Sequence, residues 1–366
     1  MNAILTFLLL TLCILMHEAG HYFVARRCGI AVSEFFIGFG PKIFSFKKNG
    51  TEYGLKAIFL GGYVKIPGMD ENEDTTEYNE NELFSNASWK SKLFVSSSGV
   101  IVNLVISFVL IAIIFSSVGM LSPTLEIESL GETISNREYP PSYEAGLKKG
   151  DKIFAFNRVE LDDWEHLVAL IEQHPNSNVE IQYLRGNKIF STLAQLDSRI
   201  IDGKSYGYLG VAPKLENINL TPLQVVSNTS YTIVAMSKSV FQGMFTLFSF
   251  DNLALLARGL MGEEVPNESR PLSPIGLAQA GSQIAESGYI NLLSLIAFVN
   301  IFLAIFNAIP LIPLDGGRMM LAIIEGATGR TIPDRKLYPL AFVVVGLFIF
   351  LGITAFYLDI TQPIKL

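Results

Sequence analysis

Four apolar segments decide what this chain can fold into. Each has about 20 residues or more, the length that a helix needs to cross a hydrocarbon layer of roughly 30 Å. The segments are Ala3–Ala25, Leu93–Val118, Ile290–Leu314 and Leu337–Leu358. Only 17% of the residues are charged, below the roughly 25% of a soluble domain, and 50% are hydrophobic. We therefore expect a polytopic α-helical membrane protein with four transmembrane helices.

Basic residues in the short connections predict the orientation of these helices. Loops rich in Lys and Arg stay on the cytoplasmic side of a membrane. The connection from 26 to 92 carries nine Lys and Arg residues, and the connection from 315 to 336 carries four more. We therefore expect both connections in the cytoplasm, and both termini and the long segment 119–288 outside it. The net charge of −7 argues against a nucleic-acid partner, because phosphate contacts need clustered basic residues.

One further stretch, Thr221–Gly262, is long and largely apolar but contains polar residues at intervals. Its apolar residues recur at helical spacing, with Asn, Ser and Lys between them. This pattern predicts a helix that lies on the membrane surface in preference to one that crosses it. A crossing helix is the alternative, and it would move the next segments to the opposite side.

Three ionisable residues interrupt the first apolar segment in the pattern His17-Glu18-x-x-His21. On a helix, positions i and i+4 share one face, so both imidazoles can bind one metal ion. Glu18 lies beside them, where its carboxylate can accept a proton from metal-bound water. Two satisfied core histidines are the alternative, but ionisable groups within a membrane span are costly and are usually functional.

A catalytic zinc ion needs a third protein ligand and an open position. His166 and His174 fall in the outer segment, so the best candidate is Asp315, a lone carboxylate at the end of the third span. A simple helix-end residue is the alternative. Asp315 and the histidines reach the same depth only if an even number of crossings separates them, which agrees with a surface position for Thr221–Gly262.

The segment after the first span predicts a β-hairpin sheet. Lys42–Lys47 alternates, Asn49–Gly50 is a strong hairpin turn, and Gly61–Gly62 is interpreted as a second turn. A His-Glu-x-x-His helix is typical of metalloproteases. A protease must hold its unwound substrate extended, and an exposed strand edge can bind it by strand addition. An ordinary cytoplasmic hairpin is the alternative. We expect the substrate to be bound by Gly61, Gly62, Tyr63 and Val64.

Several motifs together resemble the site-2 protease family of intramembrane metalloproteases, most closely the bacterial regulator-of-sigma-E type. Besides the His-Glu-x-x-His pattern, they are Glu34–Gly40, Gly61–Lys65, Ser273–Gly276 and Asn307–Gly317. In the second span the sequence departs from the family's Gly-Pro-x-x-Asn motif, because Gly99–Asn103 lacks the proline. The resemblance also implies a sheet that dips into the membrane near the metal.

The resemblance implies roles for individual residues. Zn²⁺ would be the cofactor, with His17, His21 and Asp315 as its ligands. Glu18 would be the general base, and Asn307 would contact the substrate near the metal.

Residues 124–213 resemble a PDZ domain. Glu144–Ile153 matches the turn into a central strand, and Asp162–Glu165 predicts a capping box that opens a helix to about Gln173. Tyr208–Val211 resembles a carboxylate-binding loop. The resemblance implies one extracytoplasmic PDZ-like α+β domain, which binds a peptide C-terminus or only excludes bulky substrates.

These predictions divide the chain into four parts. They are 1–118 with the first two helices and the membrane-associated sheet, 119–213 as the PDZ-like domain, 214–288 as an amphipathic surface linker, and 289–366 with the last two helices. The expected protein is an intramembrane zinc endopeptidase of the bacterial inner membrane.

Single-span membrane proteins in the lipid bilayer are the expected substrates. An anti-sigma factor, a remnant signal peptide and a pheromone precursor all fit. An inactive membrane PDZ scaffold is one alternative, and it would require a damaged metal site. A metal transporter is another, and it would require ionisable groups spread along several spans.

Overall fold

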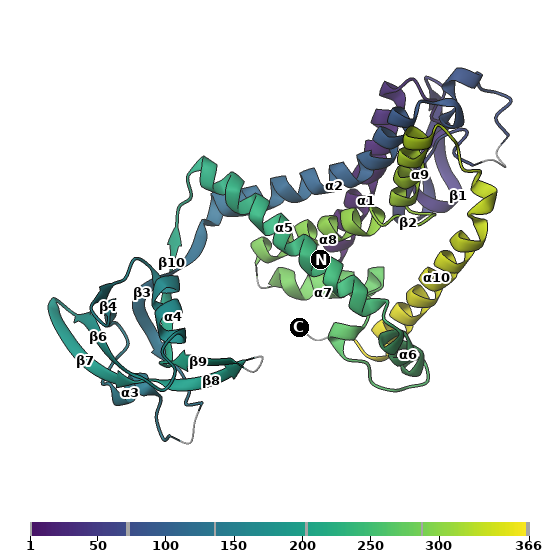
Figure 1. The fold of residues 1–366 in the computed structure, drawn as a ribbon. Helices are drawn as coiled ribbons and strands as arrows, with labels where there is room; N and C mark the ends of the chain where they lie inside the picture. Colours follow the sequence, from purple (N-terminus) through teal and green to yellow (C-terminus); the bar gives the residue numbers. More distant parts are fainter. Residues whose placement is uncertain (1, 71–73, 135–136, 202–203, 287, 364–366) are drawn as a thin grey trace. The chain divides into compact units, whose positions relative to one another are not determined.

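The computed structural model describes residues 2–70, 74–134, 137–201, 204–286 and 288–363 (Figure 1). The chain divides into two compact units. One consists of Met1–Ile114 and Leu223–Leu366, and the other of Phe115–Pro222.

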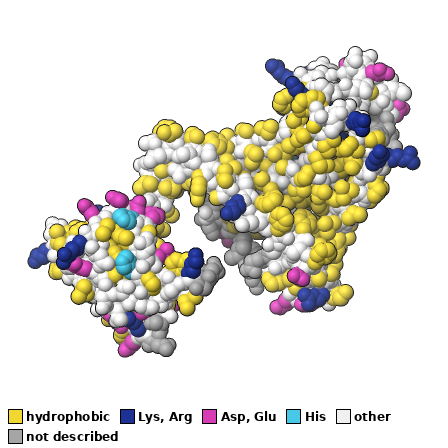
Figure 2. Space-filling view, in the orientation of Figure 1, with side chains coloured by type: hydrophobic (Ala, Val, Ile, Leu, Met, Phe, Trp, Pro, Cys, Tyr) yellow, Lys and Arg dark blue, Asp and Glu magenta, His cyan; other side chains and the backbone are white. Residues whose placement is uncertain are grey.

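The first unit consists mainly of helices. In chain order they are α1 (Asn2–Arg27), α2 (Trp89–Val118), α5 (Pro222–Leu247), α6 (Phe250–Gly259), α7 (Pro274–Glu286), α8 (Tyr289–Asn307), α9 (Asp315–Thr328) and α10 (Tyr338–Thr361), with short 3-10 turns at Glu80–Glu82, Phe84–Asn86, Asn267–Ser269 and Asp334–Lys336. Among the described residues, α1, α2, α8 and α10 are each long and apolar enough to cross a membrane. Hydrophobic side chains cover most of the visible surface of this unit (Figure 2). The chain is therefore a multi-pass membrane protein.

The third span is shorter than predicted. Helix α8 ends at Asn307 and not at Leu314, and α9 begins at Asp315 as a separate helix. Pro310 and Pro313 lie between them. A proline has no N–H for the helix ladder and pushes the residue before it out of the helical conformation. Asp315 is therefore the first residue of a new helix and not the last residue of the span.

Helices α5 and α6 occupy the stretch for which a single surface helix was predicted. They meet at 66°, with a break at 248–249. The Oγ of Ser249 accepts the N–H of Asn252 at 3.3 Å and so caps α6. Taken together, the two helices are also long and apolar enough for a bent span. The surface position of this stretch therefore stays a prediction.

Small residues let neighbouring helices approach closely. A Cβ on Gly20 of α1 would lie 3.0 Å from the Ser98 carbonyl oxygen on α2, and a Cβ on Gly281 of α7 would lie 2.3 Å from Cγ2 of Thr6. Membrane helices associate through such small-residue contacts because lipid gives them no hydrophobic driving force. Helix α1 is thereby packed against both α2 and α7.

A buried ion pair holds the end of α10. Arg270 donates to Asp359 at 2.6 Å, and both side chains are almost fully buried. The second oxygen of Asp359 accepts the N–H of Ser273 at 2.8 Å, directly before α7 begins. Because breaking a buried pair leaves an uncompensated charge, this contact fixes α10 against the start of α7.

A small sheet lies beside α1. Strands β1 (Glu34–Lys48) and β2 (Thr51–Lys65) pair antiparallel, and Asn49 and Gly50 form the predicted turn with positive φ of 51° and 81°. The start of β1, Glu34–Ile37, is paired on both sides, with Glu52–Leu55 and with Gly62–Lys65.

The second turn was predicted at Gly61–Gly62, and the chain does reverse just before Gly62, because Glu52–Leu55 run parallel to Glu34–Ile37 whereas Gly62–Lys65 run antiparallel to them. Both glycines lie inside β2. A Cβ on Gly61 would lie 3.1 Å from Ile14 of α1, and one on Gly62 would lie 2.8 Å from the Phe36 carbonyl oxygen. Glycines within a strand often mark such close approaches, and these two bring the returning segment onto α1.

The second unit contains a six-stranded sheet around its own core. The strands are β3 (Met120–Leu130), β4 (Lys152–Phe156), β5 (Val159–Glu160), β6 (Asn178–Arg185), β7 (Lys188–Gln195) and β10 (Val211–Ile218), in the order β10-β3-β4-β6-β7 with β5 beside β4. A separate hairpin joins β8 (Asp197–Ile201) to β9 (Lys204–Tyr208), and the helices are α3 (Pro141–Glu144) and α4 (Trp164–Glu172). Apolar side chains of β4, α4 and β6 meet in the core, among them Ile153, Leu167 and Ile181.

The start of α4 differs by one residue from the predicted capping box. Asp163, not Asp162, is the N-cap, and its carboxylate accepts the N–H of His166 at 2.8 Å. The third helical residue is therefore His166, so Glu165 is not in the position from which a glutamate bonds back to the cap. Asp163 alone supplies the cap.

Candidate functional site

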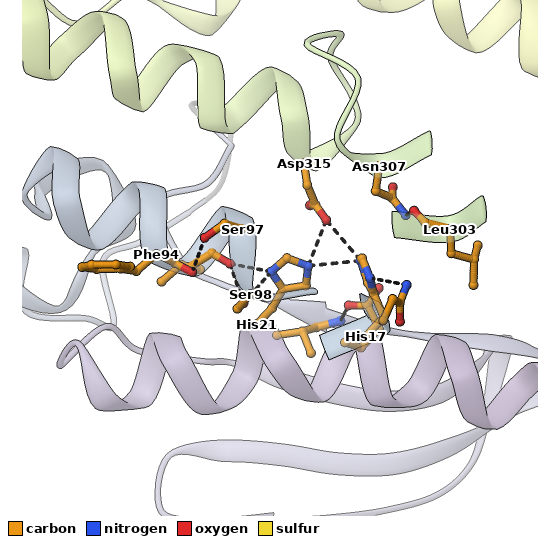
Figure 3. Close-up of polar contacts among 12 residues, drawn as sticks. His17, His21, Phe94, Ser97, Ser98, Leu303, Asn307 and Asp315 are labelled. Carbon is orange, nitrogen blue, oxygen red and sulfur yellow. Dashed lines mark hydrogen bonds and ion pairs between the residues drawn. The ribbon is translucent and has the colours of Figure 1, made fainter. Parts of the chain in front are cut away.

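The motif His17-Glu18-x-x-His21 lies on α1, where the helical repeat puts both imidazoles on one face (Figure 3). Asp315 reaches them from the first turn of α9. Its Oδ2 lies 3.1 Å from the Nε2 of each histidine, and the two Nε2 atoms lie 3.2 Å apart. Both histidines are buried and Asp315 is half-buried. The structure therefore brings together the three residues predicted as metal ligands.

The triangle of donor atoms has the size that a zinc ion requires. Zinc bonds to imidazole nitrogen and carboxylate oxygen are 2.0–2.2 Å long, so tetrahedral ligand atoms lie roughly 3.3–3.5 Å apart. The three observed separations of 3.1, 3.1 and 3.2 Å are within a few tenths of an ångström of that value. Two nitrogens and one oxygen are also donors that zinc accepts.

The second ring nitrogen of His21, Nδ1, is hydrogen-bonded to α2 and so fixes the orientation of the ring toward the triangle. Its Nδ1 lies 2.8 Å from the carbonyl oxygen of Val95 on α2 and 3.3 Å from the hydroxyl of Ser98. A carbonyl oxygen can only accept, so Nδ1 carries the proton and Nε2 keeps its lone pair for a metal.

His17 has a matching partner in α2. Its Nδ1 lies 3.2 Å from the side-chain amide of Asn103, and Asn103 Oδ1 is buried with no partner among the described residues. When Nε2 binds a metal, Nδ1 is protonated and needs an acceptor. A half-turn of the Asn103 amide brings Oδ1 to that position. The unpartnered oxygen is therefore consistent with a metal-bound His17.

Gly99 of α2 leaves the space that the two rings occupy. A Cβ at this position would lie 2.5 Å from Cε1 of His17 and 2.5 Å from Nε2 of His21. Carbon atoms that are not bonded do not approach so closely. Any side chain at position 99 would therefore push the imidazoles away from Asp315.

Asp315 is placed by the two glycines that follow it. A Cβ on Gly316 would lie 2.2 Å from the Ile309 carbonyl oxygen, and one on Gly317 would lie 2.6 Å from the Leu311 carbonyl carbon. The turn 308–314 can therefore fold directly onto the start of α9. The N–H of Leu314 donates to the Leu311 oxygen at 2.8 Å and closes this turn.

Glu18 points from α1 toward the sheet. Its Oε2 accepts the backbone N–H of Val64 at 3.1 Å. Among the other predicted substrate-binding residues, Gly61 and Gly62 lie against Ile14 and Leu15 of α1. Of the four sheet residues, Val64 is thus the one joined to the motif by a hydrogen bond.

Tyr63 and Asn307 make contacts elsewhere. The ring of Tyr63 stacks on Phe36 with 5.8 Å between centroids, and its hydroxyl donates to Glu34. Asn307 donates to the Leu303 carbonyl of its own helix at 3.0 Å (Figure 3). Neither side chain is bonded to the three clustered residues, so their binding of substrate remains a prediction.

Sequence reasoning missed what α2 contributes, namely Gly99, Asn103 and the Val95 carbonyl. A signal was present, because polar residues inside an apolar span usually face other helices. Ser96, Ser98, Asn103 and Ser107 are such residues, and all four are buried.

Comparison with known proteins gives a consistent result. The family model of Peptidase family M50 matches the chain over residues 5–351. This range includes His17, Glu18, His21 and Asp315. It is 29% identical over 359 residues to the Membrane metalloprotease ARASP, chloroplastic, of Arabidopsis thaliana, covering 94% of this chain and 75% of the relative. The Zinc metalloprotease RasP of Bacillus licheniformis is 25% identical over 444 residues, covering 99% of both chains. RasP of Geobacillus kaustophilus is 25% identical over 421 residues, covering 95% of both.

Proposed function

Because this chain belongs to peptidase family M50, the family of the site-2 proteases, we propose that it is an intramembrane zinc endopeptidase. The protein is a metalloprotease, and zinc is its cofactor. The observation that carries the proposal is the triangle of His17, His21 and Asp315, whose two histidines lie on a helix apolar enough to cross a membrane. Zinc bound there would polarise the scissile carbonyl and lower the pKa of a bound water.

Glu18 is the general base in this proposal. It follows a ligand directly on α1, and its Oε2 is held at 3.1 Å by Val64. Its Oε1 accepts no hydrogen bond from another described residue and is available to a water molecule. The carboxylate takes the proton of the attacking water and passes it to the leaving amine.

The substrate is a transmembrane segment of a single-span membrane protein. A helical segment hides its carbonyl groups in hydrogen bonds, so it must unwind before it can be cut. The extended part of β2 at Gly61, Gly62, Tyr63 and Val64 would receive the unwound backbone by strand addition. Asn307 would contact it from the end of α8, directly before the turn 308–314 that carries the chain to Asp315.

The protein would lie in a bacterial cytoplasmic membrane, with both termini and Phe115–Pro222 outside the cytoplasm. This orientation requires an even number of crossings between α1 and α9, and therefore a surface position for α5 and α6. The outer unit would be a PDZ-like domain. It would bind a substrate C-terminus or restrict the entry of substrates with bulky outer domains.

Removal of zinc tests the proposed reaction. Purified protein in liposomes is expected to cut a single-span test substrate within its membrane segment, and a zinc chelator is expected to reduce cleavage to background. Re-added zinc should restore it, because the ligands remain in place. Mass spectrometry of the fragments locates the cut. Cleavage at the full rate by protein shown to be free of metal would contradict the proposal.

Replacement of Asp315 tests the ligand set. Asp315→Ala leaves only two imidazoles, which make a poor zinc site. We expect zinc affinity to fall by more than the roughly 10- to 100-fold that loss of an outer-shell partner costs. The measurement is zinc content of the purified protein under mild chelation. Asp162→Ala, which removes an exposed carboxylate of the second unit, is the control. Full zinc occupancy in Asp315→Ala would exclude Asp315 as a ligand.

A further inference from the structure

The end of β2 has one paired edge and one edge beside α1. Residues Gly62–Lys65 pair with Glu34–Ile37 of β1, and no other described strand pairs with them on their second side. Helix α1 reaches that side, because the N–H of Val64 donates to Glu18 of α1 at 3.1 Å. Backbone groups on this edge are therefore directed at the helix that carries the His-Glu-x-x-His motif.

The alternation of the strand decides which residues point to this edge. The carbonyl oxygen of Lys65 accepts the N–H of Ser33 at 2.9 Å, so the backbone of Lys65 faces β1. Backbone groups alternate sides along a strand, so Val64 faces the opposite way. Its N–H is not needed for the pairing with β1, and it is bonded to Glu18 at 3.1 Å instead.

The two glycines make this contact possible. A Cβ on Gly61 would lie 3.1 Å from Cγ2 of Ile14, and one on Gly62 would lie 3.7 Å from Cδ1 of Leu15. Ile14 and Glu18 are four residues apart, so they share one face of α1. The strand that rests on Ile14 therefore passes Glu18 one turn later.

We propose that the backbone N–H of Val64 is a positioning donor for Glu18. The inference rests on the proposed function, in which Glu18 is the general base. A carboxylate on a flexible side chain can rotate away from a metal-bound water, and a charge-assisted hydrogen bond restricts that rotation. Holding Oε2 leaves Oε1 to face the water. The sheet thus orients the base as well as receiving the substrate.

This assignment limits how a substrate strand can pair with β2. The N–H of Val64 is occupied by Glu18, so it is not free to bond a substrate carbonyl. The substrate ladder would use the edge-facing groups of Gly62 and the carbonyl of Val64. Loss of the Val64 N–H should therefore slow the chemical step without weakening substrate binding.

The test is Val64→Pro, with Val64→Ala as its matched control. Proline removes the N–H, and it is tolerated at an edge position whose N–H is not part of the ladder. We expect kcat of Val64→Pro to fall roughly 10- to 100-fold, since small displacements of catalytic groups cost that much. KM and zinc content should stay within about twofold of wild type, as expected for a donor that acts only on the chemical step. Val64→Ala keeps the N–H but shortens the side chain, so the difference in kcat between the two variants measures the loss of the N–H.

A second variant covers the possibility that proline distorts the strand. Replacing the amide between Tyr63 and Val64 with an ester removes the N–H and keeps the valine side chain without a proline ring, and it should reproduce the fall in kcat. Substrate binding is measured separately in the uncleaving Glu18→Gln protein, with and without Val64→Pro, and should be equal. Unchanged kcat in the ester variant would overturn the inference, and so would weaker substrate binding. Failure of the wild-type protein to cleave would instead refute the proposed function.

Discussion

Glu18→Gln is expected to lose roughly 100-fold or more in the rate of peptide cleavage, because general-base groups typically supply at least that much. The glutamine side chain has nearly the same shape as the glutamate but cannot accept the proton of the attacking water. Zinc content should not change, because His17, His21 and Asp315 form the triangle without Glu18. The variant should therefore be folded, loaded with metal and inactive.

Two measurements make this result specific. Initial rates on the single-span test substrate give the loss of activity, and metal analysis of the same preparation gives the zinc content. Glu52→Gln makes the same isosteric change on a carboxylate of the sheet that pairs with Lys42, and it should retain activity within about twofold. If Glu18→Gln keeps more than about a tenth of the wild-type rate, Glu18 does not serve as the base.

Part of the candidate site could be predicted because its geometry is local. His17 and His21 are four residues apart on an apolar helix, and the helical repeat alone puts them on one face. Asp315 lies 294 residues further along. It could be proposed because it was the lone carboxylate at the end of the third apolar segment, and because the predicted topology placed that end at the same depth as the histidines. The four membrane-crossing helices followed from length and hydrophobicity.

The rest of the site depends on contacts between distant segments. The sequence shows a glycine at position 99 but not that two imidazoles lie opposite it. Gly61–Gly62 has the composition of a turn, but the sequence does not show that these two residues rest on α1. The N–H of Val64 belongs to the backbone, so no side-chain pattern reveals its partner. Each of these features is determined by the neighbouring element, which local patterns do not specify.

Gly99→Ala is expected to remove zinc although it changes no ligand. The added methyl would lie 2.5 Å from atoms of both His17 and His21, so the rings or α2 must move. These atoms belong to rings held from behind by Asn103 and by the Val95 carbonyl, and they cannot simply swing aside. We expect zinc affinity to fall by at least the roughly 10- to 100-fold typical of lost outer-shell support. Cleavage activity should fall with it.

Two other glycines separate this effect from general damage to the helices. Gly352→Ala adds a methyl to α10 where nothing lies within 4 Å, and it should keep full zinc content and activity. Gly20→Ala also crowds the α1–α2 contact, but against Val102 and the Ser98 carbonyl and not against the imidazoles. Overpacking of this kind costs about 1–3 kcal/mol of stability, so a lower melting temperature is expected for both Gly20→Ala and Gly99→Ala. Zinc loss should be much larger for Gly99→Ala, because only there does the methyl meet the ligands. Equal zinc content in the two variants would show that position 99 matters for helix packing alone.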